Sequence, residues 1–391
     1  MDNFSCFHSS VGWQRIDSSS GLSPIPVTKC GIVTLGNYMY IFGGSPEIND
    51  SESNQFFAFD LITKEWIEIN AEGECPTPRC AHAMCGFEDK IWLFGGSGTS
   101  NYLNDFYEYD VEQNKWKKIQ TQKHPKARYS HSLNYCQGRL IVFGGVPEEG
   151  ERLNDTWIFD LKSQNWNKLK ISSEIPIGRS SHTSIIFENK LIIFGGYGAD
   201  SRRHQDLWEL NIKTDQWKQI QIANDFNSKE EKMRFLRKFR FQLFSDYYDT
   251  ENKKPFYDCH IPLEMSGAVA MIYQERYLVI FGGVSSLIGT HNYTFIFDFE
   301  TNKWMNYDKL LRDFSRYHSE IDSPVKDQQK VDQNIQKPPP RFGHVGVQHD
   351  VNQLVVFGGD HYQNDVWILV LEPNIVLDLR LFLQSKQFCD F

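Results

Sequence analysis

The sequence predicts an all-β fold, a propeller of six four-stranded blades that closes into a ring. First, the tripeptide Phe-Gly-Gly occurs six times, at residues 42–44, 94–96, 143–145, 194–196, 281–283 and 357–359. Second, the first four copies are 52, 49 and 51 residues apart, a period typical of an array of small repeated sheets. Third, five units carry a tryptophan at a similar place: Trp66, Trp116, Trp166, Trp217 and Trp304.

Each unit contains strand patterns on both sides of Phe-Gly-Gly. An apolar run precedes it, as at 139–142, and a polar loop follows, often with an Asn-Asp pair, as at 154–155. The next segment, 156–160 in the third unit, alternates with period two, which is typical of a half-buried strand. After a short turn, Trp166 opens the last strand of that unit. Each unit therefore predicts one four-stranded sheet.

The glycines and the aromatic residues fit the packing of blades around an axis. Glycine has no side chain and adopts positive φ easily, so a glycine pair permits close approach and a turn at the strand end. Large aromatic side chains bury the most surface in the wedge between neighbouring sheets. A closed ring leaves only short, protected strand edges.

The ends of the chain predict how the ring closes. The sixth unit ends with the strand pattern 366–370 and has no tryptophan after it. The missing piece matches residues 13–16 (Trp-Gln-Arg-Ile), which resemble 116–119 (Trp-Lys-Lys-Ile). We therefore expect Trp13 to lie in the outer strand of the last blade, so that the propeller spans residues 13–371.

These repeats resemble the kelch-repeat family over almost the whole chain. The resemblance rests on six correlated copies of the glycine pair, the alternating strand and the tryptophan, and it implies a six-bladed kelch β-propeller. It does not imply one function, because propellers host both enzymes and binding modules.

A second motif repeats where one unit joins the next. Arg79, Arg128, Arg179 and Arg341 each stand three residues before a histidine, just ahead of the inner strand. In the first and fifth units we align Lys29 and Glu264 with this arginine. Equivalent positions in successive blades share one radius and height, so we expect these side chains to gather at the opening of the central channel.

Arginine binds carboxylates in a fork geometry, so such a cluster predicts an anion-binding site. In kelch proteins that act as substrate receptors, the matching arginines bind acidic peptides or free C-terminal carboxylates, and the resemblance implies the same here. The candidate partner-binding residues are Arg79, Arg128, Arg179, Arg341, Lys29, Tyr129, Ser130, Ser180 and Phe342. The alternative is that the arginines pair with loop carboxylates or backbone carbonyls and order the blade junctions. For the four histidines we favour a structural role.

Two insertions, about 222–262 and 306–340, interrupt the repeat and should lie on the same rim. Residues 229–240 look helical and basic, with an apolar stripe through Leu236, Phe239 and Leu243. A lid or partner helix is the favoured interpretation, and nucleic-acid or membrane contact is the alternative. The second insertion ends in three prolines and predicts a mostly mobile loop.

Residues 372–391 lie outside the repeats. The stretch 378–391 starts as an amphipathic helix and resembles the opening of a BTB domain. It indicates either a piece of a kelch–BTB protein or a short helix that caps the propeller. The kelch–BTB order resembles the leucine-zipper-like regulator family, which implies a substrate adaptor of a cullin-type ubiquitin ligase.

Composition narrows the function classes. A formal net charge of −9 makes nucleic acid an improbable partner. Residues 1–10 do not resemble a secretory signal, no run reaches the ~18 apolar residues of a membrane span, and the cysteines form no C-x-x-C pair. We expect a cytoplasmic protein-binding module, not an enzyme, without metal or cofactor. The alternatives are a metal-dependent oxidase or lyase on a kelch propeller, for which no E-x-x-x-D-x-x-x-H run exists, and a cytoskeletal or organelle scaffold.

Overall fold

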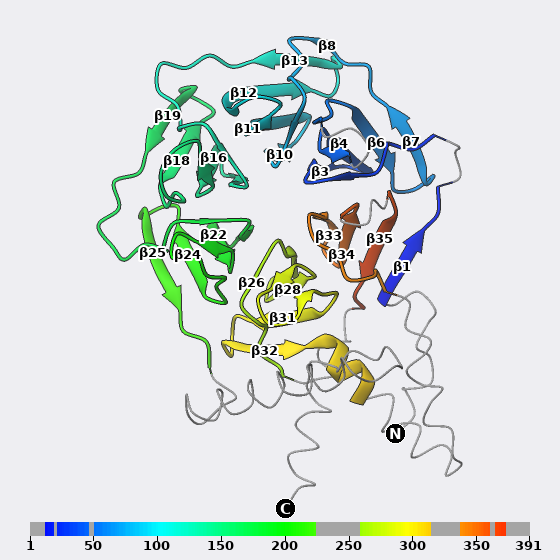
Figure 1. Ribbon diagram of the computed structural model, residues 1–391, viewed down its shortest axis with the longest axis vertical. Helices are drawn as coiled ribbons and strands as arrows, with labels where there is room; N and C mark the ends of the chain where they lie inside the picture. The colour runs from blue at the N-terminus through cyan, green and yellow to red at the C-terminus, as the bar shows by residue number, and fades with distance from the viewer. Residues whose placement is uncertain are drawn as a thin grey trace, which may run out of the picture.

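The computed structural model describes residues 12–18, 22–46, 51–223, 259–313, 337–359 and 364–372. Within these residues the chain is mostly strand, with one short helical stretch at 307–313. The strands form small antiparallel sheets, and Figure 1 shows these sheets set around a common centre. The all-β prediction is confirmed, and the arrangement fits a β-propeller.

Six sheets share one plan, in which four antiparallel strands lie side by side in order from the centre outward. The first contains β3 (Gly31–Leu35), β4 (Tyr38–Phe42), β6 (Phe56–Asp60) and β7 (Glu65–Glu68). The second contains β10 (Ala83–Phe87), β11 (Lys90–Gly98), β12 (Tyr102–Asp110) and β13 (Lys115–Lys118). The third contains β15 (Ser132–Cys136), β16 (Arg139–Phe143), β18 (Thr156–Asp160) and β19 (Asn165–Lys168).

The remaining three sheets follow in chain order around the same centre. The fourth contains β21 (Thr183–Phe187), β22 (Lys190–Phe194), β24 (Leu207–Asn211) and β25 (Gln216–Ile220). The fifth contains β27 (Val269–Tyr273), β28 (Tyr277–Phe281), β31 (Thr294–Asp298) and β32 (Lys303–Asn306). The sixth contains β33 (Val345–Asp350), β34 (Gln353–Phe357), β35 (Val366–Val370) and β1 (Gly12–Ile16).

Short strands sit where one sheet leads into the next. They are β2 (Val27–Thr28) with β5 (Ser45–Pro46), β9 (Arg79–Cys80) with β11, β14 (Arg128–Tyr129) with β17 (Val146–Pro147), and β20 (Arg179–Ser180) with β23 (Tyr197–Gly198). The fifth set is β26 (Met265–Ser266) with β29 (Val284–Ser285), which also pairs β30 (Gly289–Thr290). In addition, β8 (Glu72–Gly73) runs parallel to β13. The five antiparallel sets tie the junctions of the first five units to the loop that follows Phe-Gly-Gly in the same unit.

One aromatic contact repeats between all neighbouring sheets. The tryptophan of each fourth strand packs on the phenylalanine of the Phe-Gly-Gly in the preceding sheet, with ring centroids 4.3 to 5.7 Å apart. The pairs are Trp116–Phe42, Trp166–Phe94, Trp217–Phe143, Trp304–Phe194, Trp13–Phe281 and Trp66–Phe357. The last pair links the first sheet to the sixth, so the series of contacts returns to its start.

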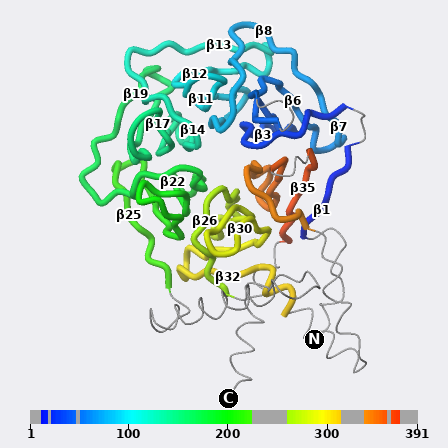
Figure 2. The backbone as a smooth tube through the Cα atoms, viewed as in Figure 1, coloured from blue at the N-terminus to red at the C-terminus, as the bar shows by residue number. Residues whose placement is uncertain are grey.

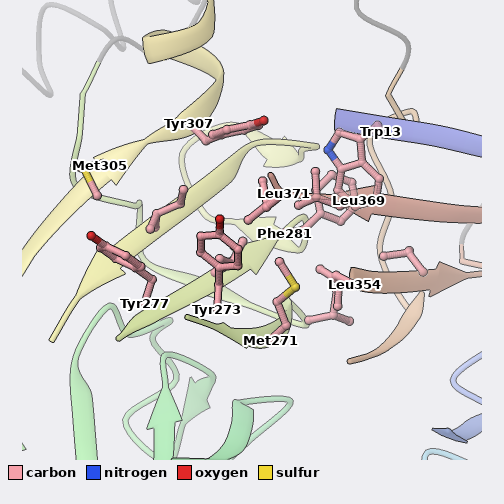
Figure 3. Packing of buried hydrophobic residues seen from close by; sticks show 14 of the residues in the cluster. Trp13, Met271, Tyr273, Tyr277, Phe281, Met305, Tyr307, Leu354, Leu369 and Leu371 are labelled. Carbon is pink, nitrogen blue, oxygen red and sulfur yellow. The ribbon is translucent and has the colours of Figure 1, made fainter. Parts of the chain in front are cut away.

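The N-terminal strand lies in the sixth sheet. β1 pairs antiparallel with β35, with Trp13 opposite Leu369, and the sheet continues through β34, which carries Phe357. Figure 2 shows this blue strand beside the red end of the described chain. In Figure 3, Trp13 packs beside Leu369, Leu371 and Phe281 in one buried cluster.

A second series of contacts runs through the backbone near the centre. Six junction residues have positive φ, and five hydrogen bonds between their peptide groups join them in a row from Gly343 through Lys29 to Gly267. In order around the ring these residues are Lys29, Ala81, Ser130, Ser181, Gly267 and Gly343. The Lys29 N–H donates to the carbonyl of Gly343 at 2.8 Å, so this series also joins the first unit to the last.

The described parts of the two insertions pack into the core. Cys259, Ile261 and Leu263 are buried between the fourth and fifth sheets. Tyr307 and Leu310, in the helical stretch after β32, are buried with Trp13, which contradicts a mobile loop over that part of 306–340. The proposed basic helix at 229–240 and the BTB-like tail at 378–391 lie outside the described residues.

Candidate partner-binding rim

The junction arginines are buried. Arg79, Arg128 and Arg179 have 0% exposed surface, and Arg341 has 1%. Each guanidinium donates to the carbonyl of the first glycine of Phe-Gly-Gly in its own unit, as Arg128 does to Gly144 at 2.9 Å. The Nε of Arg128 also donates to the carbonyl of Lys126 at 3.0 Å. These bonds fix the junction loop to the end of the second strand.

Each arginine also forms a two-pronged ion pair with one aspartate. The pairs are Arg79–Asp105, Arg128–Asp155, Arg179–Asp206 and Arg341–Asp365, with shortest N–O distances of 2.6 to 2.9 Å. Burial raises the pKa of the Asp155 carboxyl, but the hydrogen bonds and charge of Arg128 outweigh burial and hold that pKa below its ordinary value. Parallel N–H to oxygen bonds of this kind are the strongest arginine contacts.

These contacts do not support the expected anion-binding cluster of arginines at the channel opening. Arg79, Arg128, Arg179 and Arg341 do not offer free charge to a partner, because each is enclosed and neutralised inside its own junction. The alternative stated above, that they order the blade junctions, describes the structure. Removal of either member of such a buried ion pair would leave an uncompensated buried charge, so the pair is held together within the junction.

The alignment of Lys29 and Glu264 with these arginines is also wrong. Arg128 pairs with Pro147, four residues after the phenylalanine of Phe-Gly-Gly. The residues in the same register are Val27, opposite Pro46, and Met265, opposite Ser285. Lys29 instead occupies the positive-φ position two residues further on, and Glu264 lies exposed before the strand.

Sequence reasoning missed a signal that identifies the pairs. The aspartate partner stands directly before the third strand in three of the units, as Asp155 stands before β18, and Asp105 has the equivalent place within the longer strand β12. In the two units without the arginine, that place holds Gln55 and Tyr293. Arginine and aspartate thus occur together or are absent together within one chain, which is what a paired buried charge requires.

The positions of the junction histidines fit the structural role that we favoured for them. His82, His131 and His344 are buried, and each packs edge-on against the phenylalanine of the preceding Phe-Gly-Gly. The ring centroids of His131 and Phe94 are 5.3 Å apart. Burial and the charge of Arg128 lower the pKa of His131 to about 3, so its imidazole is neutral at physiological pH.

Other residues remain on the surface of the rim. By the junction rim we mean the short strands β2, β9, β14, β20 and β26 with the loops that pair with them, the residues that directly follow these strands, and residues 341–343 of the sixth unit. Lys29 is exposed, and its ammonium lies 6.0 Å from the ring centre of Phe342. Tyr129 is half-buried and packs edge-on against Tyr102, with ring centroids 4.7 Å apart. Ser130 belongs to the central series of backbone hydrogen bonds described above.

Two arginines that sequence reasoning did not select lie on this rim. The Nε of Arg152 donates to the hydroxyl of Ser180 at 3.2 Å, and the Nε of Arg203 donates to the hydroxyl of Ser266, also at 3.2 Å. Both guanidinium groups lie against the ring of Tyr197. Ser180 is itself buried, so it takes part through the arginine that it holds. No repeated motif marks Arg152 or Arg203, because each stands in a loop of variable length.

Two general findings concern the described residues. They contain no group of three or more His, Cys, Asp or Glu side chains placed to hold a metal ion. No described helix has both the length and the apolar character to cross a membrane.

Comparison with known proteins agrees with the fold. A family model described as "FBX42, beta-propeller domain" matches residues 29–217. The host cell factor homolog hcf-1 of Caenorhabditis elegans is 29% identical over 54% of this chain and 29% of its own length. Kelch domain-containing protein 3 of Bos taurus is 28% identical over 54% of this chain and 60% of its own length.

A third relative carries the name of an enzyme. N-(sulfonatooxy)prop-2-enimidothioate sulfolyase of Thlaspi arvense is 28% identical over 48% of this chain and 56% of its own length. The chain thus matches about 30 to 60% of the length of these three relatives, whose names differ in function. The matches support a kelch-type β-propeller and a protein-interaction module as its general role.

Proposed function

We propose that the chain is a closed six-bladed propeller, residues 13–371, that binds other proteins through the junction rim. The closure is supported by the six tryptophan–phenylalanine contacts and by the hydrogen bond from Lys29 to Gly343. A ring tied at its seam holds the junction loops in fixed relative positions. A rigid scaffold that presents variable loops is the usual basis of a binding face.

The observation that supports the binding role is the contrast between the buried side chains and the surface side chains of the rim. The repeated charges, such as Arg128 and Asp155, are buried and cancel each other. Above them the side chains differ from junction to junction, with Lys29 beside Phe342 and Tyr129 beside Tyr102. Tyrosine and arginine are the residues most enriched at the centres of protein interfaces.

The partner class is a protein that supplies an acidic segment or a C-terminal carboxylate. Exposed cations on an otherwise acidic chain favour such a partner. A more specific role, as a substrate adaptor of a cullin-type ubiquitin ligase, rests only on the resemblance of residues 378–391 to a BTB domain. The cytoplasmic location remains an expectation from the sequence.

Affinity capture with two matched variants tests the binding role. Lys29→Glu with Tyr129→Ala changes one charge and one stacked aromatic residue on the junction rim. Lys162→Glu with Phe87→Ala makes the same changes at the opposite ends of the sheets, where Phe87 stacks on Tyr135. We expect the rim variant to lose partners that the opposite-face variant retains, at equal melting temperature. Equal partner sets for both variants would refute binding through the rim.

An enzyme is the second candidate, and the sulfolyase relative favours it. Metal analysis of the purified chain, followed by assay with and without the metal found, tests this candidate. A stoichiometric transition metal with a metal-dependent turnover would replace the binding module as the main function.

A further inference from the structure

We propose that Arg152, Tyr197 and Arg203 form a clamp for two acidic side chains placed two residues apart in an extended segment of another protein. This inference rests on the proposed binding function of the junction rim and names its ligand chemistry. The three residues are called the Tyr197 clamp below.

Two loops from different units meet at the clamp. The guanidinium carbon of Arg152, in the loop of the third unit, lies 4.3 Å from the ring centre of Tyr197. The guanidinium carbon of Arg203, in the loop of the fourth unit, lies 5.5 Å from the same centre. A cation is stabilised over an aromatic face at these distances. One half-buried tyrosine therefore holds two positive charges close together.

The backbone fixes this arrangement. Tyr197 in β23 pairs with Ser180 in β20 on one side and forms an isolated bridge with Arg203 on the other. Directly paired residues of an antiparallel ladder project to the same face, so Ser180, Tyr197 and Arg203 form one row. Arg152 reaches this row from the neighbouring unit by its bond to Ser180. The clamp is thus held at both ends before any ligand arrives.

Neither clamp arginine forms an ion pair within the described residues, in contrast to the four junction arginines. The Nε of Arg152 and the Nε and Nη1 of Arg203 each donate a hydrogen bond to a serine hydroxyl. The two Nη groups of Arg152 and the Nη2 of Arg203 remain for other acceptors. Two like charges at short range repel each other, and a carboxylate beside each relieves that repulsion.

The spacing selects the ligand. Both guanidinium carbons lie within the stated distances of one ring centre, so their separation cannot exceed the sum of those distances. Alternate residues of an extended strand are roughly 7 Å apart and project to one face. Two acidic side chains in the pattern Glu-x-Glu can therefore reach one guanidinium each and balance both charges, whereas a single carboxylate supplies one negative charge against two positive ones.

Fluorescence anisotropy with the full chain tests the clamp. The probes are labelled ten-residue Gly-Ser peptides with an amidated C-terminus, carrying Glu-Ser-Glu, Gln-Ser-Glu or Gln-Ser-Gln. We expect Glu-Ser-Glu to bind at least tenfold more tightly than either glutamine peptide, and less tightly as salt rises. Equal affinity for the three peptides would overturn the proposal. A fourth peptide, Gln-Ser-Gln with a free C-terminal carboxylate, is measured as well. Tighter binding of this peptide than of Glu-Ser-Glu would also overturn the proposal, because the clamp would then recognise chain termini.

Protein variants complete the test. Arg152→Gln with Arg203→Gln should lose at least tenfold in affinity for the Glu-Ser-Glu probe, and Tyr197→Leu should lose affinity through misplaced arginines. The exposed neighbour Arg202→Gln is the matched control and should bind like the parent. Unchanged binding by the double variant, with an unchanged melting temperature, would overturn the clamp. The capture experiment with Lys29 and Tyr129 variants would still stand, since it does not use these residues.

Discussion

The ring of Trp13 lies 4.3 Å from the ring of Phe281, centre to centre, although 268 residues separate them in the chain. The same contact joins Trp116 to Phe42 and recurs at every boundary between sheets. Trp13 thus fills the one fourth-strand position that the sixth unit leaves empty. The stability of the ring should depend on this N-terminal residue as strongly as on any interior tryptophan.

Trp13→Ala should lower the free energy of unfolding by ~3–5 kcal/mol, the usual cost of removing a buried aromatic side chain. Urea unfolding followed by tryptophan fluorescence measures the change. Arg15→Ala, on the exposed side of the same strand, is the control and should change stability little. Equal, small effects of the two substitutions would show that β1 adds nothing to the ring.

Arg128→Met should destabilise the protein by ~3–5 kcal/mol, because it leaves Asp155 buried without its partner. The fifth unit shows how the charges can be removed together, since it holds Met265, Tyr293 and, in place of Trp157, Phe295. The triple variant Arg128→Met, Asp155→Tyr, Trp157→Phe copies that arrangement and should regain most of the lost stability. Chemical denaturation of the two variants tests this, and a triple variant weaker than the single one would contradict it.

The sequence predicts the repeated parts of this fold well. Each strand pair and each tryptophan lies in a pattern that recurs every fifty residues or so. Alignment of several copies shows which residues occupy equivalent positions. The pairing of β1 with β35 follows from the same logic, because a missing strand at one end matched a surplus strand at the other. The helical stretch at 307–313 interrupts the repeat and had no second copy to reveal it.

The candidate site was harder to predict, for a physical reason. A repeated arginine looks the same in sequence whether it faces solvent or a buried carboxylate. The distinction lies in the partner, and Asp155 stands 27 residues away from Arg128. The half-buried arginines at 152 and 203 have no counterpart at the same place in the other units, so periodicity does not reveal them. Repetition identifies the scaffold, whereas the residues that we propose for binding do not recur from unit to unit.

Stability should fall as the pH falls from about 7 toward 4, through the buried histidines. The pKa of His131 is lowered from 6.5 to about 3 by burial and by Arg128, so below pH 6.5 only the unfolded chain takes up the proton. The contribution of neutral His131 to the free energy of unfolding is therefore fully present above pH 6.5. It is lost progressively as the pH falls from 6.5 toward 3.

His131→Ala, which copies Ala268 of the fifth unit, should show a smaller loss of stability between pH 7.5 and pH 5. One histidine with this shift contributes a difference of roughly 2 kcal/mol over that interval. Denaturation curves at both pH values for parent and variant give the comparison directly. Parallel losses would mean that His131 takes up a proton in the folded state.

Gly144→Ala should be more harmful than Gly138→Ala, although both glycines have positive φ, +66° and +76°. A Cβ at 144 would lie 2.6 Å from the carbonyl oxygen of Arg179, whereas a Cβ at 138 meets nothing within 4 Å. That carbonyl also accepts the N–H of Gly145 at 2.8 Å, so it cannot move away without breaking the bond that joins two units. Gly138→Ala carries only the backbone cost of positive φ, about 1–2 kcal/mol, and Gly144→Ala adds the displacement of the next junction. Thermal unfolding of the two variants should therefore separate them clearly, with Gly144→Ala melting lower. If they melt together, the glycine pair serves only the turn, and close packing between units does not explain why Phe-Gly-Gly repeats.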